Sequence, residues 1–181
     1  MAALQALTEW LEAERVPYAA IGGVAVSLLA QPRATQDIDA VIWLEQERWG
    51  ELLEVGAAYG FTPRISAAVE FAARSRVLLL RHVPSGISID LSCAALTFEQ
   101  ELIERAVTLD LGGVKLKVPT PEDLLITKAV AHRPKDLIDI EAIIEAHPRL
   151  DVRRIQRWTQ EFSDALEMPE IMESIEHLLR Q

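Results

Sequence analysis

The sequence has one cysteine, Cys93, among its 181 residues. One cysteine excludes an intrachain disulfide and any zinc site built from a cysteine cluster. No apolar stretch approaches the roughly 18 residues that a membrane-spanning helix needs, and residues 1–15 read as an amphipathic helix with acids rather than a basic flank before an apolar core. These absences predict a cytoplasmic protein with no membrane partner.

Basic residues are also scarce. The chain has 18 lysines and arginines against 28 aspartates and glutamates, which gives a formal net charge of -10. A surface that coats nucleic acid needs clustered Lys and Arg, so this balance argues against one, although it is compatible with a local basic groove. Half of the residues are apolar and a quarter are charged, as in a soluble globular protein with one domain, or one domain and a small appendage.

The apolar patterns predict an α+β fold, with a small mixed β-sheet flanked by helices and an all-helical C-terminal tail. Strands are expected at residues 18–21, 37–44, 77–83, 87–93, 107–111 and 114–118. Helices are expected at residues 4–15, 24–30, 46–59, 66–74 and 97–106, and after residue 119 at new starts near Thr120, Pro134, Asp151 and Pro169. We therefore expect an αβ core over residues 1–118 and a helical subdomain over residues 119–181 that packs on this core.

Three short segments carry specific local signals. Gly112-Gly113 predicts a tight two-residue hairpin. Pro84-Ser85-Gly86 predicts a second hairpin between two strands. The segment 97–100, Thr-Phe-Glu-Gln, has the form of a capping box and predicts a helix start.

Three aspartates carry the strongest chemical signal. Alternate residues of a strand point to the same face, so Asp37 and Asp39 project together. In residues 87–93 apolar positions alternate with polar ones, and Asp90 lies on the polar face. Carboxylates held side by side raise each other's pKa unless a cation lies between them. Mg²⁺ takes oxygen ligands and bridges to phosphates, so the three aspartates form a candidate metal site for chemistry on a nucleoside triphosphate.

Gly22-Gly23 is the second element of this candidate site. The pair lies fourteen residues before Asp37, between a predicted strand and a predicted helix. Glycine lets the backbone approach a phosphate closely, and a helix N-terminus offers free N–H groups. Strand-to-helix turns also use glycine for geometry alone, and a lone Asp-x-Asp fits acids that face solvent. The combination of the glycine pair with three aspartates favours the site.

These residues resemble the signature of the DNA polymerase beta-like nucleotidyltransferase superfamily. Ile21-Gly22-Gly23, thirteen intervening residues and Asp37-Ile38-Asp39-Ala40 match its hydrophobic-Gly-Gly/Ser and Asp-hydrophobic-Asp/Glu-hydrophobic motifs. Asp90, within Ile89-Asp90-Leu91, matches the third acid, which the superfamily places on a later strand.

The chain is also similar to one bacterial branch, the AbiEii-like group, whose members include abortive-infection toxins of toxin–antitoxin pairs. Residues 33–39 resemble the group's Arg-x-Thr-x-Asp-hydrophobic-Asp motif. Residues 121–128 and 133–139 resemble its helical motifs. The resemblance spans roughly residues 17–145, with four motifs in the expected order.

The resemblance implies a nucleotidyltransferase fold and a magnesium-dependent transfer of a nucleoside monophosphate from an NTP to a hydroxyl acceptor. Asp37, Asp39 and Asp90 would be the catalytic metal ligands, with Asp90 as third ligand or base, and Asp139 would help to complete the site. The implied nucleotide-binding residues are Gly22, Gly23, Arg33, Thr35, Lys128, Arg133, Lys135 and Asp136. The implied partners are an antitoxin protein and an acceptor such as tRNA or protein.

The helical residues have simpler interpretations as well. Lys128 on a helix is usually solvated, and Lys135 with Asp139 fits a surface ion pair of small value. Arg149, Arg153, Arg154 and Arg157 form a basic cluster that fits a phosphate-rich acceptor such as tRNA, or a solvated helix balanced by nearby acids.

Two other functions stay open from the sequence. The chain could be a catalytically silent binding module of the same fold, although three converging carboxylates would then cost stability without a purpose. It could also modify a small molecule, as aminoglycoside-adenylating enzymes do, and its acidic charge would suit a cationic acceptor.

Overall fold

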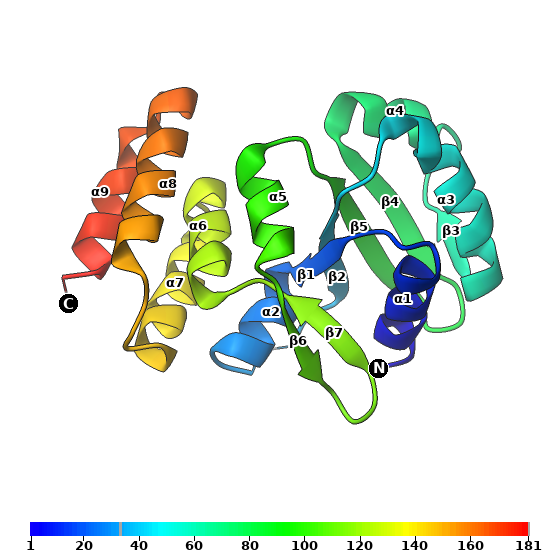
Figure 1. Cartoon of the computed structure of the whole chain (residues 1–181), viewed down its shortest axis with the longest axis horizontal. Helices are drawn as coiled ribbons and strands as arrows, with labels where there is room; N and C mark the ends of the chain where they lie inside the picture. Colours follow the sequence, from blue (N-terminus) through cyan, green and yellow to red (C-terminus); the bar gives the residue numbers. More distant parts are fainter. Residues whose placement is uncertain (33, 181) are drawn as a thin grey trace. The chain divides into compact units, whose positions relative to one another are not determined.

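The computed structural model describes residues 1–32 and 34–180 (Figure 1). Arg33, one of the implied nucleotide-binding residues, lies outside the described residues. The chain forms two compact units. Unit 1 comprises Met1–Val24 and Ala34–Pro119, and unit 2 comprises Ala25–Arg33 and Thr120–Gln181.

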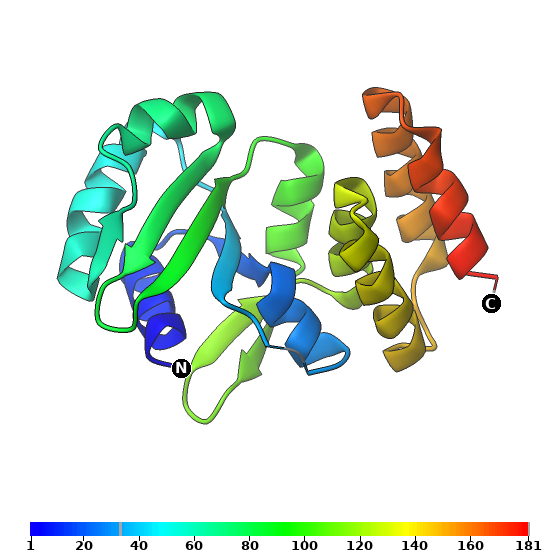
Figure 2. The same cartoon turned by 180° about the vertical axis from the view of Figure 1, so that it is seen from behind.

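Unit 1 is built on a five-stranded mixed sheet, which confirms the α+β class. Its strands are β1 (Tyr18–Ile21), β2 (Asp37–Ile42), β3 (Phe61–Pro63), β4 (Val77–His82) and β5 (Ile87–Cys93), in the spatial order β1-β2-β5-β4-β3. β2 and β5 are parallel, and the other neighbours are antiparallel. Figure 2 shows β4 and β5 in green with β2 in blue. The parallel pair aligns the two segments that carry the predicted catalytic aspartates.

Unit 1 also contains four helices that lie entirely within it and two short 3-10 helices. They are α1 (Ala2–Ala13), α3 (Trp49–Gly56), α4 (Ala68–Ser75), α5 (Thr97–Glu104), η1 (Gln46–Arg48) and η2 (Ala57–Tyr59). α3 and α4 lie on one side of β4 and β5, and α5 lies on the other (Figures 1 and 2). Trp10 of α1 stacks on Phe61 of β3 with ring centroids 5.0 Å apart, and both rings are buried. This aromatic pair anchors α1 and the edge strand in the core.

A hairpin of β6 (Val107–Asp110) and β7 (Lys115–Val118) follows α5. Gly112 and Gly113 have φ of 73° and 100°, the left-handed values that a tight turn of this kind requires, and Leu111 N–H donates to Val114 C=O at 2.9 Å. The predicted Gly-Gly hairpin is therefore confirmed. The β4–β5 hairpin is confirmed too, with Gly86 N–H donating to His82 C=O at 2.8 Å.

Unit 2 contains α6 (Pro121–Ala131), α7 (Pro134–Ala146), α8 (Val152–Leu166) and α9 (Pro169–Leu178). α6 begins as predicted, because the Thr120 hydroxyl caps it by accepting from Asp123 N–H at 3.3 Å. Helix α2 (Gly22–Leu29) begins in unit 1 and ends in unit 2, where His147 Nε2 lies 2.6 Å from Leu29 C=O. None of the helices in the described chain is long and apolar enough to cross a membrane.

Several predicted boundaries need correction. The strand expected at 37–44 ends at Ile42, and the helix expected at 24–30 begins earlier, at Gly22. The helix expected at 46–59 is divided into η1, α3 and η2. β3 is a strand that the sequence pattern does not predict, because its three residues, the last of them a proline, are too few to show alternation. The N-cap of α5 is Leu96 rather than Thr97, and Glu99 Oε2 accepts from Ala95 N–H and Leu96 N–H at 2.7 and 2.9 Å.

Candidate active site

The three predicted catalytic aspartates lie on adjacent strands of the sheet. Asp39 lies directly opposite Asp90 in the parallel β2–β5 pair, and Asp37 lies opposite Ser88. Residues paired in this way point to the same face. Asp37 is exposed, and Asp39 and Asp90 are half-buried. The sheet thus brings the three carboxylates onto one partly open face, which we call the acid face.

Gly22 holds the start of α2 against this face. Its φ is +63°, and a β-carbon added at Gly22 would stand 2.0 Å from Asp39 Oδ2, far inside van der Waals contact. Only glycine allows both the backbone conformation and the close approach. The helix N-terminus and an aspartate carboxylate therefore meet at one point. A helix N-terminus favours anions such as phosphate.

Opposing effects act on the pKa of the Asp90 carboxyl. Burial raises the pKa of its carboxyl above the ordinary value, the Arg64 guanidinium lowers it, and the charge of Asp37 raises it. The net direction is upward. Burial is the largest of these effects, because it disfavours the charged form of the carboxyl. A bound cation would favour the charged form of Asp90.

Arg64 is a residue of this site that no sequence pattern identifies. Its guanidinium forms an ion pair with Asp90 Oδ1. Arg64 directly follows β3, and its backbone N–H donates to the C=O of Leu79, the β4 residue that lies opposite Asp90. No motif marks Arg64, and the ion pair spans 26 positions of the chain.

The donor set on the acid face fits a hard divalent cation. Three carboxylates offer oxygen atoms only, which suits Mg²⁺ rather than metals that prefer nitrogen or sulfur ligands. In residues 1–32 and 34–180, no group of three or more His, Cys, Asp or Glu side chains is already gathered closely enough to hold a metal. The Arg64 guanidinium provides positive charge at Asp90 instead. A cation bound at Oδ1 of Asp90 would therefore compete with Arg64 for that oxygen.

The loop before β2 borders a cavity of about 200 Å³. Thr35, a predicted nucleotide-binding residue, donates its hydroxyl to Asp37 C=O at 2.5 Å and so stabilises the start of β2. Its lining includes Val24, Thr35, Asp37, Ile38, Ser85 and Ile87. The cavity offers space beside the Asp37 carboxylate.

Within unit 2, Lys128 forms a buried ionic cluster. Its Nζ lies 3.0 Å from Asp136 Oδ1 and 2.8 Å from Asp139 Oδ2, and all three side chains are buried. Arg133 Nε lies 2.5 Å from Asp136 Oδ2, whereas Lys135 is exposed. The interpretations of Lys128 as solvated and of Lys135–Asp139 as a surface pair are therefore wrong. Nucleotide binding by these residues stays a prediction.

Asp136 keeps its charge although it is buried. Burial alone would raise the pKa of its carboxyl, but hydrogen bonds from Arg133 and Lys128, together with their positive charges, lower the pKa below the ordinary value. The net effect makes Asp136 a stable anion at the start of α7. The cluster thus has a clear structural role within unit 2.

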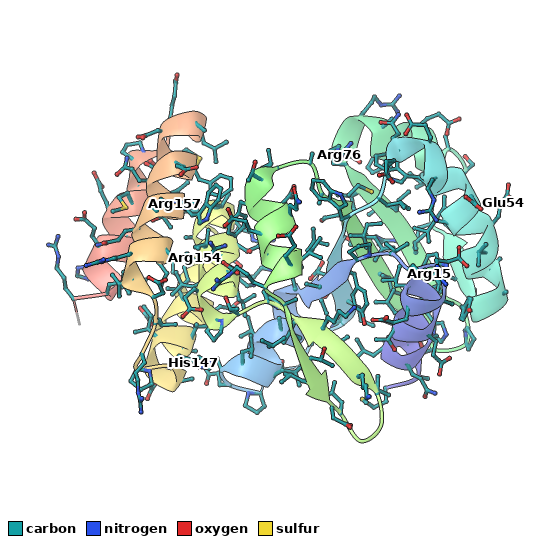
Figure 3. All side chains as sticks on the ribbon, in the orientation of Figure 1. Arg15, Glu54, Arg76, His147, Arg154 and Arg157 are labelled. Carbon is teal, nitrogen blue, oxygen red and sulfur yellow. The ribbon has the colours of Figure 1, made fainter. Side chains whose placement is uncertain are left out.

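Two arginines of the predicted basic cluster in the tail differ in exposure, Arg154 and Arg157, and both are labelled in Figure 3. Arg154 of α8 is largely buried, and its Nε lies 2.7 Å from Asp123 Oδ1. Arg157 is exposed, with its guanidinium 4.6 Å from the centroid of the Trp158 ring and 3.4 Å from Glu161. Arg154 therefore stabilises the packing of α8 against α6 and is not available for an acceptor.

Comparisons with known proteins identify the family and the fold. A family model described as a nucleotidyltransferase of unknown function (DUF6036) matches residues 2–173. A search of curated proteins gives no significant match.

Solved structures show the same fold. An antigenic nucleotidyltransferase-like protein from Paracoccidioides brasiliensis aligns with a TM-score of 0.55 and 20% identity, over 96% of this chain and 90% of that one. The antibiotic-resistance factor ANT(2'')-Ia aligns in its solution structure with a TM-score of 0.61 and 15% identity, over 93% and 94%. Its crystal structure with adenylyl-2"-tobramycin aligns with a TM-score of 0.59 and 15% identity, over 90% and 95%. The predicted nucleotidyltransferase fold is confirmed.

Proposed function

We propose a specific reaction for this chain, which belongs to the nucleotidyltransferase family DUF6036. It transfers a nucleoside monophosphate from an NTP to a hydroxyl acceptor, with Mg²⁺ held by Asp37, Asp39 and Asp90. The observation that carries the proposal is the pairing of Asp39 with Asp90 in the sheet, with Gly22 pressed against the Asp39 carboxylate.

Each residue of the acid face has its own role in the proposed reaction. The N–H groups at the start of α2, beside Gly22, bind the β- and γ-phosphates. Asp37 and Asp39 would hold the cation that accompanies the triphosphate, and Asp90 lies nearest to the acceptor. Mg²⁺, when bound, neutralises phosphate charge and lowers the pKa of the acceptor hydroxyl.

The proposed reaction is an in-line displacement. The acceptor oxygen forms a bond to the α-phosphorus while the bond from that phosphorus to the α,β-bridging oxygen breaks. Pyrophosphate leaves on the side of Gly22, and Asp90 accepts the proton of the hydroxyl. Asp90 is placed for this role because it lies directly opposite Asp39 in the β2–β5 pair, on the side away from Gly22.

Calorimetry with each NTP and MgCl₂ tests the proposal. We expect wild-type protein to bind at least one NTP only when Mg²⁺ is present, and Asp39→Asn to weaken that binding by at least tenfold. Glu54→Gln is the matched control, because Glu54 is an exposed acid on α3. Absence of magnesium-dependent binding, or an unchanged Asp39→Asn variant, would show that the chain is a silent binding module of the same fold.

There are two candidates for the acceptor, each with its own biological role. The AbiEii-like motifs favour a toxin that modifies tRNA or protein and is neutralised by an antitoxin. The net charge of -10, and the solved structure of ANT(2'')-Ia with adenylyl-2"-tobramycin, favour a cationic small molecule. Growth inhibition on expression would support the toxin, whereas protection against aminoglycosides would support the second candidate.

A further inference from the structure

The acid face continues onto β4 as a basic strip. Arg81 of β4 lies opposite Ser88, which itself lies opposite Asp37, so Asp37, Ser88 and Arg81 form one row across the sheet. Asp39, Asp90 and Leu79 form the next row. Paired residues share a face, so the Arg81 side chain projects from the same side as the three aspartates.

Arg64 belongs to the same strip. The backbone N–H of Arg64 donates to Leu79 C=O, so Arg64 extends the row of Asp39, Asp90 and Leu79 by one position. Its side chain crosses β4, and the guanidinium forms the ion pair with Asp90. The alternation of β4 supports this orientation, because Leu78 and Leu80 are buried on the opposite face while Arg81 is exposed. Arg64 and Arg81 together are called the arginine strip.

We propose that the arginine strip is the acceptor subsite and that the acceptor carries a phosphate close to its reacting hydroxyl. This inference rests on the proposed nucleotidyl transfer. Attacking and leaving oxygens lie on opposite sides of the α-phosphorus in such a reaction. In the proposed reaction the triphosphate lies beside Gly22, which directly follows β1, and so on the β1 side of the aspartates. The acceptor must then approach from the β4 side, across the arginine strip.

The ion pair of Arg64 with Asp90 is exchangeable. The side chains are 31% and 36% exposed, respectively, and pairs of this kind are held weakly in water. A cation bound to Asp90 would repel the guanidinium and free it for an anionic acceptor. Arginine matches phosphate with two parallel N–H groups, which gives the strip a geometric preference for this ligand.

A cationic acceptor fits this side of the site poorly. Strand spacing places Arg81 about 9–10 Å from Asp37, close enough for its charge to act on a molecule bound at the aspartates. An aminoglycoside reaching Asp90 would meet two guanidinium groups of its own sign. The local charge therefore opposes the preference suggested by the net charge of -10.

The inference is tested by fluorescence anisotropy with a labelled six-residue RNA that has a free 3′ hydroxyl. Binding is measured with MgCl₂ and the non-transferable analogue α,β-methylene ATP. We expect Arg64→Gln and Arg81→Gln each to weaken RNA binding by about tenfold, and each to reduce the slope of log K against log salt by about 0.7. Arg48→Gln is the control, since Arg48 is an exposed arginine of η1, with an ion pair of 3.9 Å to Glu51. Arg81→Lys should restore part of the affinity.

Competition identifies the source of the phosphate. Displacement of the RNA by equal concentrations of AMP would assign the strip to small phosphorylated acceptors, and displacement only by unlabelled RNA would assign it to nucleic-acid ends. The inference is overturned if both Gln variants bind RNA like wild type, or if tobramycin binds wild type more tightly than RNA and AMP do. Calorimetry with Mg²⁺ and α,β-methylene ATP measures nucleotide binding separately in the same variants. If the variants bind both the nucleotide and the RNA like wild type, the acceptor subsite alone is rejected. If wild type does not bind the nucleotide, the nucleotidyl transfer is rejected.

Discussion

Gly22 and Asp39 are in such close contact that no side chain can be placed between them. A β-carbon at Gly22 would lie 2.0 Å from Asp39 Oδ2 and 2.8 Å from Asp39 Cγ. Ile21, the residue before Gly22, lies opposite Asp39 in the β1–β2 pair, so the register of the sheet fixes this contact. The turn into α2 and the carboxylate therefore form one rigid unit.

Gly22→Ala should damage both the site and the fold. The left-handed φ of +63° costs a non-glycine residue about 1–2 kcal/mol, and the new methyl group must displace the Asp39 carboxylate. A displacement of about 1 Å is enough to reduce nucleotidyl transfer by about 100-fold. Urea denaturation and NTP turnover measure the two effects.

Gly50→Ala is the matched control. Gly50 lies in the first turn of α3, and a β-carbon added there would meet nothing within 4 Å, so alanine should be accommodated without a clash and leave turnover unchanged. Equal behaviour of the two variants would mean that the contact of Gly22 with Asp39 has no role.

The acid face is predictable from the sequence because its signals are local. Alternation in two short strands puts Asp37, Asp39 and Asp90 on polar faces, and the predicted bounds of β5, Ile87–Cys93, are correct. The spacing from Gly22 to Asp37 then links the two elements to a known signature. Each of these inferences depends on a few neighbouring residues and on the two-residue period of a strand.

Contacts between distant segments are not predictable in this way. Arg64 reaches Asp90 only because β3 and β4 align, and β3 itself has too few residues to give a pattern. A lysine on a helix is usually solvated, whereas α7 brings two aspartates to the ammonium group of Lys128. A charge is buried when a partner exists, and the partner is a property of the tertiary structure.

Lys128→Met should lower the free energy of unfolding by about 3–5 kcal/mol, because Asp136 and Asp139 then lose a buried cation. Lys135→Met, at an exposed position of the same motif, should change it by less than about 0.5 kcal/mol. Chemical denaturation followed by circular dichroism measures both. A stable Lys128→Met variant that fails to bind NTP would instead favour the predicted nucleotide-binding role.

Acid should weaken unit 2 through Asp136. Its pKa is lowered in the folded protein, so its contribution to stability is complete above the unfolded-state value of about 3.9 and is lost as the pH falls through the folded-state pKa. The difference in unfolding free energy between wild type and Asp136→Asn should therefore be largest above about pH 5 and shrink below about pH 4. Denaturation series at several pH values measure it.

Glu141→Gln controls for the loss of an acid from α7, because Glu141 is exposed. Its effect on the free energy of unfolding should stay small at every pH. A difference for Asp136→Asn that is independent of pH would contradict the assignment of the ionised carboxylate to the buried cluster.

Cys93 should report the opening of the sheet beside the site. It is 2% exposed at the end of β5, and burial, opposed by Arg76 and assisted by Glu99, raises the pKa of its thiol to about 12. Since the thiolate is the reactive form, a disulfide reagent at about pH 8 should modify the folded protein only when β5 opens. The signal is unambiguous because the chain has no other cysteine.

Ligand binding should slow this modification. Asp90 lies three residues before Cys93 on the same strand, so Mg²⁺ and NTP bound at the acid face must leave before β5 can open. At a ligand concentration of about 100 Kd, the open state should become about 100-fold rarer, which is about 2.7 kcal/mol of added stability, and labelling should slow by the same factor. At the same ligand concentration, Asp39→Asn should reduce the protection by about tenfold or more, while Glu54→Gln keeps it. Labelling that is equally fast with and without Mg²⁺ and NTP would place the nucleotide elsewhere than on β2 and β5.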